Sequence, residues 1–295
     1  MLLATWNGSA HLSEQLASLA AQEGVDWSLL WRDDGSTDGT VALLEGFAEA
    51  HPGHVARLAE PVGRLGAGAS FMALLAAAPE NGLYAFMDQD DVWLPQKLAR
   101  AAAQLGTEAM LVCTRLRLVT PDLTPIGLSH LPSRPPIFAT LLAHNVAAGC
   151  TMVMNARARG LALSAPLPRE GHHDWWCVLL VTGCGGRLIF DPEPGLLYRQ
   201  HGGNLVGGAV GLRERARRAL GRGAAGFLEP LARYIEALRS APLTAQARQV
   251  LDAAEGLRAA SPIRRLAALR QAGLAHHARG ANWLLRLWVA LNRMH

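Results

Sequence analysis

The sequence predicts an α/β fold in which a mostly parallel central sheet is flanked by helices and followed by a C-terminal helical extension. Strand-like apolar runs alternate with amphipathic helical stretches through the first hundred residues, as in parallel sheets covered by helices. The charge then changes sign, because residues 1–211 carry 13 basic and 19 acidic side chains and residues 212–295 carry 15 and 5. We therefore expect an α/β domain over residues 1–211 and a basic α-helical extension over residues 212–295.

The elements of the α/β domain can be assigned in chain order. Apolar runs bounded by turn residues predict strands, and apolar residues three or four positions apart predict helices. The predicted order is a strand from Leu2 to Thr5, a helix capped near Ser9, a strand from Trp27 to Trp31, a helix from about Thr40, a strand near Val55 to Leu58, a helix bearing Phe71, Leu74 and Leu75, and a strand from Leu83 to Met87. Pro95 fits the first turn of the next helix, where its missing N–H costs nothing.

Beyond residue 110 the periodic signals become mixed. We expect strands from Met110 to Leu118 and from Thr151 to Asn155, and a helix from Asp174 to Val181. From Leu212 onward, breaks at Gly, Ser and Pro residues separate about three predicted helices.

The composition is that of a folded protein from a reducing compartment. Half of the 295 residues are hydrophobic, so the chain can bury a full core. The four cysteines lack the C-x-x-C spacing of zinc sites, and we expect them in the core. No basic and apolar leader opens the chain, and the uncharged stretch from Pro135 to Ala156 contains residues that suit buried strand and loop better than lipid. We therefore expect a cytoplasmic protein without a transmembrane helix.

Three carboxylates follow the predicted strand that ends at Met87, within the four residues Asp88-Gln89-Asp90-Asp91. Negative charge gathered at a strand tip is costly unless a cation lies among the acids. Oxygen ligands without Cys or His between them favour Mg²⁺ or Mn²⁺ over zinc, and such ions commonly hold the phosphate groups of a substrate. The sequence therefore predicts a phosphate-handling enzyme.

Two further polar clusters follow predicted strands. They are Thr5-Trp6-Asn7-Gly8 and Asp33-Asp34-Gly35-Ser36-Thr37-Asp38. In an open α/β sheet, ligands bind beyond the carboxyl ends of the strands, so the three clusters would meet at one edge. Each cluster alone could instead be a turn or a helix cap.

The second cluster has a competing interpretation. The run from Asp34 to Gly39, followed by Glu45, fits the spacing of a calcium-binding EF-hand loop. An EF-hand requires an entering helix, however, and the preceding segment is strand-like. We therefore favour the sheet-edge interpretation.

Five motifs in this order resemble the family 2 glycosyltransferases, especially the bacterial rhamnosyltransferase-like branch. They are Ala4-Thr5-Trp6-Asn7-Gly8, Arg32 to Thr40, Asp88-Gln89-Asp90-Asp91-Val92-Trp93, His173-Asp174-Trp175-Trp176 and Tyr198-Arg199-Gln200-His201-Gly202. The resemblance covers roughly residues 1–208. It implies a Rossmann-like GT-A fold, a nucleotide-diphosphate sugar donor, a divalent metal such as Mn²⁺ or Mg²⁺, and transfer with inversion at the anomeric carbon.

The resemblance also implies roles for individual residues. Thr5, Asn7, Asp33 and Asp34 would bind the nucleoside, Asp88 its ribose or the metal, and Asp91 and Arg199 the donor sugar or its loop. Asp90 would be the metal ligand of the D-x-D motif, with His201 completing the metal or diphosphate contacts. Asp174 would be the catalytic base, although its position also suits a helix N-cap. Trp175 and Trp176 would bind the acceptor, or one of them would belong to the core, because adjacent helical residues do not share a face.

The resemblance implies an acceptor as well, a glycan or a lipid-linked oligosaccharide in the assembly of cell-surface polysaccharide or O-antigen. The basic extension suits an anionic surface, so it could dock on the inner face of the cytoplasmic membrane, or its helices could pack on the α/β domain. We expect no nucleic-acid partner. Two rivals remain, a processive polysaccharide synthase and a non-catalytic nucleotide- or carbohydrate-binding protein on the same scaffold.

Overall fold

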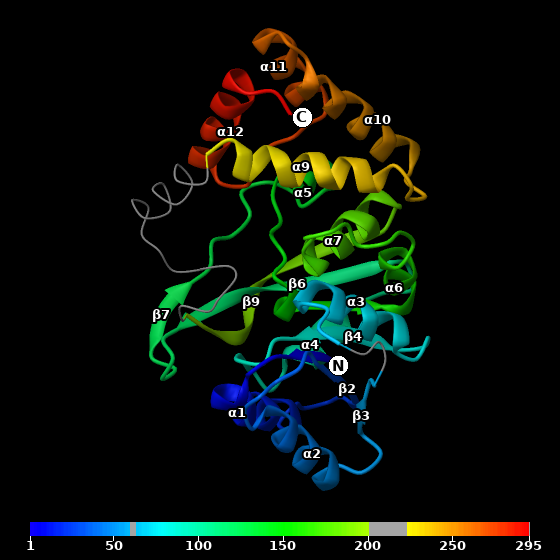
Figure 1. The fold of residues 1–295 in the computed structure, drawn as a ribbon, viewed down its shortest axis with the longest axis vertical. Coiled ribbons are helices and arrows are strands. Elements are labelled where there is room, and N and C mark those ends of the chain that lie inside the picture. Colours follow the sequence, from blue (N-terminus) through cyan, green and yellow to red (C-terminus); the bar gives the residue numbers. More distant parts are fainter. Residues whose placement is uncertain (60–62, 201–222, 295) are drawn as a thin grey trace.

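The computed structural model describes residues 1–59, 63–200 and 223–294 (Figure 1). The strands of these residues are β1 (Leu2–Thr5), β2 (Leu29–Asp33), β3 (Val55–Arg57), β4 (Leu83–Met87), β5 (Val92–Trp93), β6 (Met110–Val119), β7 (Pro125–Leu128), β8 (Met152–Asn155) and β9 (Arg187–Arg199). They form one sheet in the order β3-β2-β1-β4-β8-β6-β9-β5, and β7 pairs with β6.

The helices of the described residues cover this sheet and extend beyond it. They are α1 (Ser9–Ala20), α2 (Thr40–Ala50), α3 (Ala67–Ala77), α4 (Lys97–Gln104), α5 (Phe138–Ala143), α6 (Ala156–Ala162), α7 (His173–Gly183), α9 (Ala225–Leu238), α10 (Ala245–Ala254), α11 (Pro262–Gln271) and α12 (Arg279–Leu291), with the short 3₁₀ helices η1 (Gly149–Thr151) and η2 (Glu255–Arg258).

The sheet has a parallel half and a mixed half. Strands β3, β2, β1 and β4 are parallel neighbours, as the sequence predicts. Strand β8 is antiparallel to both β4 and β6, while β6 and β9 run parallel. The parallel half therefore brings the carboxyl ends of β1, β2 and β4 to one edge, with β1 in the middle.

Alternating side chains of the strands fill two hydrophobic clusters, one on each face of the sheet. Leu2 and Phe86 belong to the cluster shared with α3 and α7, whereas Leu3 and Met87 belong to the cluster shared with α1. This follows from the period of two in a strand, which points successive side chains to opposite faces. Both faces are apolar because both are covered by helices, which is why these strands are almost uninterrupted apolar runs.

The C-terminal helices form a layer at one end of the molecule, where α9 lies beside α5 and α7 (Figure 1). Leu231 and Ile235 of α9 belong to the same hydrophobic cluster as Trp176 of α7. The Tyr234 hydroxyl accepts a hydrogen bond from the backbone N–H of His172 at 2.9 Å. Of the two alternatives for the extension, packing on the α/β domain is therefore confirmed for α9.

Four α-helices are described in this extension, where about three are predicted from its helix breaks. The predicted domain boundary between residues 211 and 212 lies outside the described residues and stays a prediction. Among the described helices, none is long and apolar enough to cross a membrane.

Two predicted elements differ from the structure. The second strand begins at Leu29 and continues to Asp33, so the first aspartate of the second polar cluster is still part of the strand. Pro95 precedes α4 and does not lie in its first turn, because the helix begins at Lys97. The long strand β9 was not predicted at all, and it carries Arg199 to the edge of the site.

Candidate active site

The loops after β1 and β4 are tied to each other by paired hydrogen bonds. The backbone N–H of Trp6 donates to Gln89 Oε1 at 2.9 Å, and Gln89 Nε2 donates to the Trp6 carbonyl at 3.1 Å. Gly8 leaves room for this pair, because a Cβ at that position would lie 2.4 Å from Gln89 Oε1. The predicted meeting of these loops at one sheet edge is confirmed.

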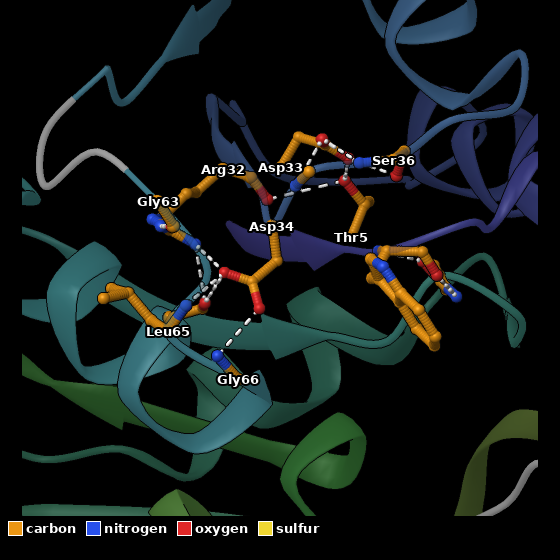
Figure 2. A network of polar contacts seen from close by, with 12 residues as sticks. Thr5, Arg32, Asp33, Asp34, Ser36, Gly63, Leu65 and Gly66 are labelled. Atoms are coloured by element: carbon orange, nitrogen blue, oxygen red, sulfur yellow. Dashed lines mark hydrogen bonds and ion pairs between the residues drawn. The ribbon is translucent and has the colours of Figure 1, made fainter.

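Asp33 joins the loop after β2 to the end of β1 (Figure 2). Its Oδ1 accepts hydrogen bonds from the Thr5 hydroxyl at 3.0 Å and the Ser36 hydroxyl at 2.5 Å, and its Oδ2 accepts from the Ser36 N–H at 2.7 Å. Asn7 belongs to the same network, since its N–H donates to Ser36 Oγ at 2.8 Å. Thr5, Asn7 and Asp33, to which the family resemblance assigns nucleoside binding, therefore lie side by side.

The side chain of Asp34 lies in a different environment from that of Asp33. Its carboxylate accepts hydrogen bonds from Arg32 Nη1 at 2.6 Å, the Leu65 N–H at 2.6 Å and the Gly66 N–H at 2.7 Å (Figure 2). Burial raises the pKa of Asp34, but these N–H groups together with the guanidinium bring it below its usual value. The side chain is buried and surrounded by protein donors.

Asp34 therefore anchors the loop that leads into α3, and its predicted contact with the nucleoside stays a prediction. The EF-hand interpretation is wrong, because Asp34 follows strand β2 and its carboxylate binds protein donors at both oxygens.

A pocket of about 360 Å³ opens beside this network. Trp6 and Asp33 form one part of its wall, and the Arg64 guanidinium lies over the Trp6 ring at 4.2 Å from its centroid. Arg57 lines the pocket as well and lies 4.9 Å from the Trp31 ring. An aromatic face together with carboxylate and guanidinium groups suits a ligand that combines a planar ring with polar and anionic groups. Its other lining residues are Arg32, Asp34, Gly35, Leu58, Ala59 and Gly63.

The acidic loop after β4 is compact and partly buried. Ligand-type atoms of Asp88, Asp91 and Cys150 lie within 4.8 Å of one another. Burial, followed by the charges of Asp90 and Asp174, raises the pKa of Asp88 to about 7. Neither carboxylate oxygen of the fully buried Asp91 has a hydrogen-bond partner among the described residues.

These carboxylates fit a hard divalent cation. Like charges at this distance raise each other's pKa, and a cation among them would relieve the repulsion. The orphaned oxygens of Asp91 are the kind of ligand that Mg²⁺ and Mn²⁺ prefer. The Cys150 thiol is a poorer ligand for such ions, because burial and the charges of the two carboxylates raise its pKa well above the usual value.

Lys97 lies beneath the acidic loop and was not predicted to belong to the site. Its side chain is buried, and Nζ lies 3.8 Å from the centroid of the Trp93 ring without a hydrogen-bond partner in the described part of the chain. Burial lowers the pKa of Lys97 to about 8, although the charges of Cys150, Asp91 and Asp88 oppose this shift. The ammonium is thus a buried counter-charge to the acids.

Asp174 lies in the first turn of α7, close enough to the acidic loop for its charge to raise the pKa of Asp88. Its Oδ1 accepts the N–H of Trp175 at 2.6 Å. Burial raises the pKa of Asp174, while that N–H lowers it. The alternative that Asp174 is the helix N-cap is wrong, because His172 occupies that position.

The two tryptophans after Asp174 separate into different surroundings. Trp176 is 0% exposed and its Nε1 donates to the Ala165 carbonyl at 3.2 Å, so its predicted acceptor contact is corrected to a core role. Trp175 is partly buried, with Nε1 donating to the Leu141 carbonyl at 2.7 Å and its ring 4.8 Å from that of Tyr234. An acceptor contact of Trp175 stays a prediction.

Arg199 is buried behind the acidic loop. Its Nε donates to the Asp90 carbonyl at 2.8 Å, Nη1 donates to the Pro121 carbonyl, and Nη2 is paired with the Glu14 carboxylate. We therefore revise its predicted role from donor contact to positioning of the loop that carries Asp90. Asp90 itself is partly exposed, and its assignment as metal ligand stays a prediction. His201 lies outside the described residues.

Sequence reasoning thus missed Lys97, Cys150 and the Gln89 bridge. Lys97 could have been noticed as the single lysine of the chain, six residues after the acidic motif ends at Asp91. Cys150 carries no sequence signal, because it reaches the acids only through the pairing of β4 with β8.

The fold is that of the GT-A glycosyltransferases. Among solved structures, TarS of S. aureus in complex with UDP-GlcNAc superposes with a TM-score of 0.61 at 16% identity, covering 92% of this chain and 80% of that chain. The mannosyltransferase PcManGT from Pyrobaculum calidifontis, in complex with GDP-Man and Mn²⁺, gives a TM-score of 0.53 at 18% identity, covering 92% and 72%.

A sequence profile described as Glycosyl transferase family 2 matches residues 2–158, and the chain belongs to this family. The dTDP-rhamnosyl transferase RfbG of Shigella flexneri is 28% identical over 234 residues, which are 73% of this chain and 77% of that protein. An uncharacterized glycosyltransferase of Nostoc sp. is 33% identical over 212 residues, 69% of this chain and 65% of that protein.

Proposed function

We propose that the protein is an inverting, metal-dependent glycosyltransferase. It would move rhamnose or another hexose from a nucleotide-diphosphate donor to a hydroxyl of a glycan or lipid-linked acceptor. The observation that carries this proposal is the position of Asp174 against the acidic loop, at the same sheet edge as the Thr5–Asp33 network. The proposed base, the proposed metal site and the proposed nucleoside pocket would then share this edge.

The donor would lie across the carboxyl ends of β1, β2 and β4. Asp33 and Trp6 both line the pocket, and Trp6 offers an aromatic face for the nucleobase. Asp88, Asp90 and Asp91 would hold the divalent ion. When bound, Mn²⁺ or Mg²⁺ would supply positive charge to the departing diphosphate.

Asp174 would remove the proton of the acceptor hydroxyl. A single carboxylate within hydrogen-bond reach is sufficient as general base. Its raised pKa makes it a better proton acceptor than an exposed aspartate, while the N–H of Trp175 holds one oxygen in place. Attack by the acceptor on the face opposite to the leaving nucleotide would invert the anomeric carbon, as in the inverting glycosidases.

Arg199 and Lys97 would support this arrangement. Arg199 holds the backbone of Asp90 through its Nε, so the loop keeps its shape when the donor leaves. Lys97 would offset part of the buried negative charge of Asp91 and Asp88, so that these acids can be ionised together.

The donor and pathway are proposed from the relatives. Because one relative is a dTDP-rhamnosyl transferase, we propose dTDP-rhamnose as the first donor to test, and a role in cell-surface polysaccharide or O-antigen assembly. The four cysteines are unpaired, which suits the reducing cytoplasm as the place of the reaction.

Two substitutions separate donor binding from chemistry. Asp90→Ala should abolish metal-dependent donor binding in calorimetry, because it removes the proposed ligand. Asp174→Asn should leave donor affinity near that of the wild type and lower turnover by about 100-fold or more, since an amide still accepts the N–H of Trp175 but cannot take a proton.

Asp252→Asn, on the exposed surface of α10, is the matched control and should leave both binding and turnover unchanged. Substantial turnover by Asp174→Asn would contradict the assignment of the base. Donor binding by Asp90→Ala that still depends on the metal would contradict the assignment of the metal ligand.

A further inference from the structure

The last helix carries an apolar surface that stays exposed among the described residues. Trp283, Leu287 and Leu291 of α12 follow one another at four-residue intervals, and their exposed fractions are 65%, 37% and 70%. The opposite face of the same helix is buried, with Leu285 and Val289 both 1% exposed. A helix that is apolar on both sides has a second partner, because isolated soluble proteins rarely expose such stripes.

The sequence around this stripe carries charge of one sign. From residue 256 to the end, the sequence contains seven arginines and no acidic residue. Arg286 lies on the exposed side of α12, next to the stripe, and Arg293 is exposed just beyond the end of the helix. The partner should therefore be both apolar and anionic.

We propose that the α12 face formed by Trp283, Leu287 and Leu291 docks on the surface of an anionic phospholipid bilayer. Tryptophan and leucine would enter the boundary between headgroups and acyl chains, and Arg286 and Arg293 would contact the lipid phosphates. A second copy of the chain is the weaker occupant, because apposing two such faces would bring their arginines together without any acid between them.

The dimensions of α12 indicate how it would lie. Its 13 residues form a helix of about 20 Å, shorter than the roughly 30 Å hydrocarbon core of a bilayer. The helix would thus lie along the surface with its apolar stripe inserted, and it would not cross the membrane.

The helix is held firmly to the rest of the protein. Arg265 of α11 is buried, and its Nε and Nη2 donate to the carbonyls of Val289 and Ala290 at 2.7 and 2.6 Å. Met294 N–H donates to the Leu257 carbonyl at 3.2 Å. Because α12 is fixed in this way, docking it would orient the whole molecule on the membrane.

Vesicle flotation of the full chain tests this proposal without depending on transferase activity. The vesicles contain either phosphatidylcholine alone or phosphatidylcholine with 30% phosphatidylglycerol (about 0.15 M NaCl). We expect flotation with the anionic vesicles, lost by at least tenfold in the double variant Trp283→Ser with Leu291→Ser. The matched control Ile126→Ser removes an apolar side chain of 45% exposure from β7, far from α12, and should float like the wild type (Figure 1).

The charge is tested separately by Arg286→Gln and Arg293→Gln. Each should weaken binding to the anionic vesicles by about fivefold, since one arginine near such a surface contributes about 1 kcal/mol. Circular dichroism of every variant checks that the fold is intact.

Three results would overturn the proposal. The first is equal flotation of the double variant and the wild type, and the second is equal binding of the wild type to neutral and anionic vesicles. The third is a wild type that binds no vesicles but forms a dimer in light scattering, where the double variant is a monomer. The third result would identify the α12 face as a contact between two copies.

Discussion

Asp33 and Asp34 are adjacent, and the structure predicts opposite consequences when each is changed to asparagine. Asp34 pairs with Arg32 at 2.6 Å, and the two side chains are only 7% and 3% exposed, so solvent screens the pair little. The groups around the carboxylate are donors, two of them the N–H groups of Leu65 and Gly66. An asparagine must therefore point its NH₂ group at one of these donors.

The size of the effect follows from these contacts. Removing one partner of a buried ion pair costs about 3–5 kcal/mol, and a hydrogen bond to a charged group contributes about 1.5–3 kcal/mol. We expect Asp34→Asn to lower the free energy of unfolding by about 3–5 kcal/mol at pH 7. The folded-state pKa of Asp34 is below its usual value, so this contribution is present above about pH 4 and is lost as the pH falls through the folded-state pKa.

Asp33→Asn is the control. Asp33 is partly exposed and has no arginine partner in the described residues, so we expect Asp33→Asn to lower the free energy of unfolding by about 1 kcal/mol. Its loss of nucleotide affinity should be larger than that of Asp34→Asn. Urea unfolding followed by circular dichroism measures stability, and calorimetry measures nucleotide binding. If Asp34→Asn unfolds within about 0.5 kcal/mol of the wild type, or if Asp33→Asn is the less stable of the two, the loop-anchor account of Asp34 is refuted.

Three further changes test other parts of the structure. Burial lowers the folded-state pKa of His173 to about 3, so its contribution to the free energy of unfolding is complete above the unfolded-state pKa near 6.5 and is lost as the pH falls below it. Between pH 7 and 5, the free energy of unfolding measured in urea should fall by up to about 2 kcal/mol more for the wild type than for His173→Asn. Equal falls in the two proteins would contradict this. Gly8→Ala should displace Gln89 and lower stability by about 1–3 kcal/mol in thermal unfolding, and Gln89→Ala in the same chain should recover part of that loss; no loss in Gly8→Ala would show that the loop adapts freely. Trp176→Ala should cost about 3–5 kcal/mol of stability as a core residue, whereas a loss confined to acceptor KM would restore its predicted role in acceptor binding.

The first half of the fold could be predicted because its signals are local. The strand Leu83–Met87 is a continuous apolar run with turn residues at both ends, and the strand Leu2–Thr5 is a mostly apolar run followed by turn residues; each was placed correctly. β9 was missed because Pro192, Pro194 and Gly195 interrupt its pattern, and these residues normally exclude a central strand. It is formed by pairing with β6, where the register shifts at Thr114 and Arg115.

The sequence predicts at which edge of the sheet the site lies, but it does not predict the individual contacts between the side chains there. Parallel strands place their following loops together whatever the side chains are, so the gathering of Thr5, Asp33 and Asp88 follows from the fold class. The difference between Asp33 and Asp34 depends on Arg32 and on a loop about thirty residues away, which no local pattern records.

The central claim is that this sheet edge transfers a sugar from a nucleotide donor with the help of a divalent ion. Release of nucleoside diphosphate from a panel of donors, dTDP-rhamnose among them, measured with Mn²⁺ and after removal of metal by a chelator, tests it most directly. We predict turnover of at least one donor with Mn²⁺, its loss with the chelator, and its recovery when Mn²⁺ is restored. Tight nucleotide binding without turnover of any donor would contradict the claim and identify a binding protein on a glycosyltransferase scaffold.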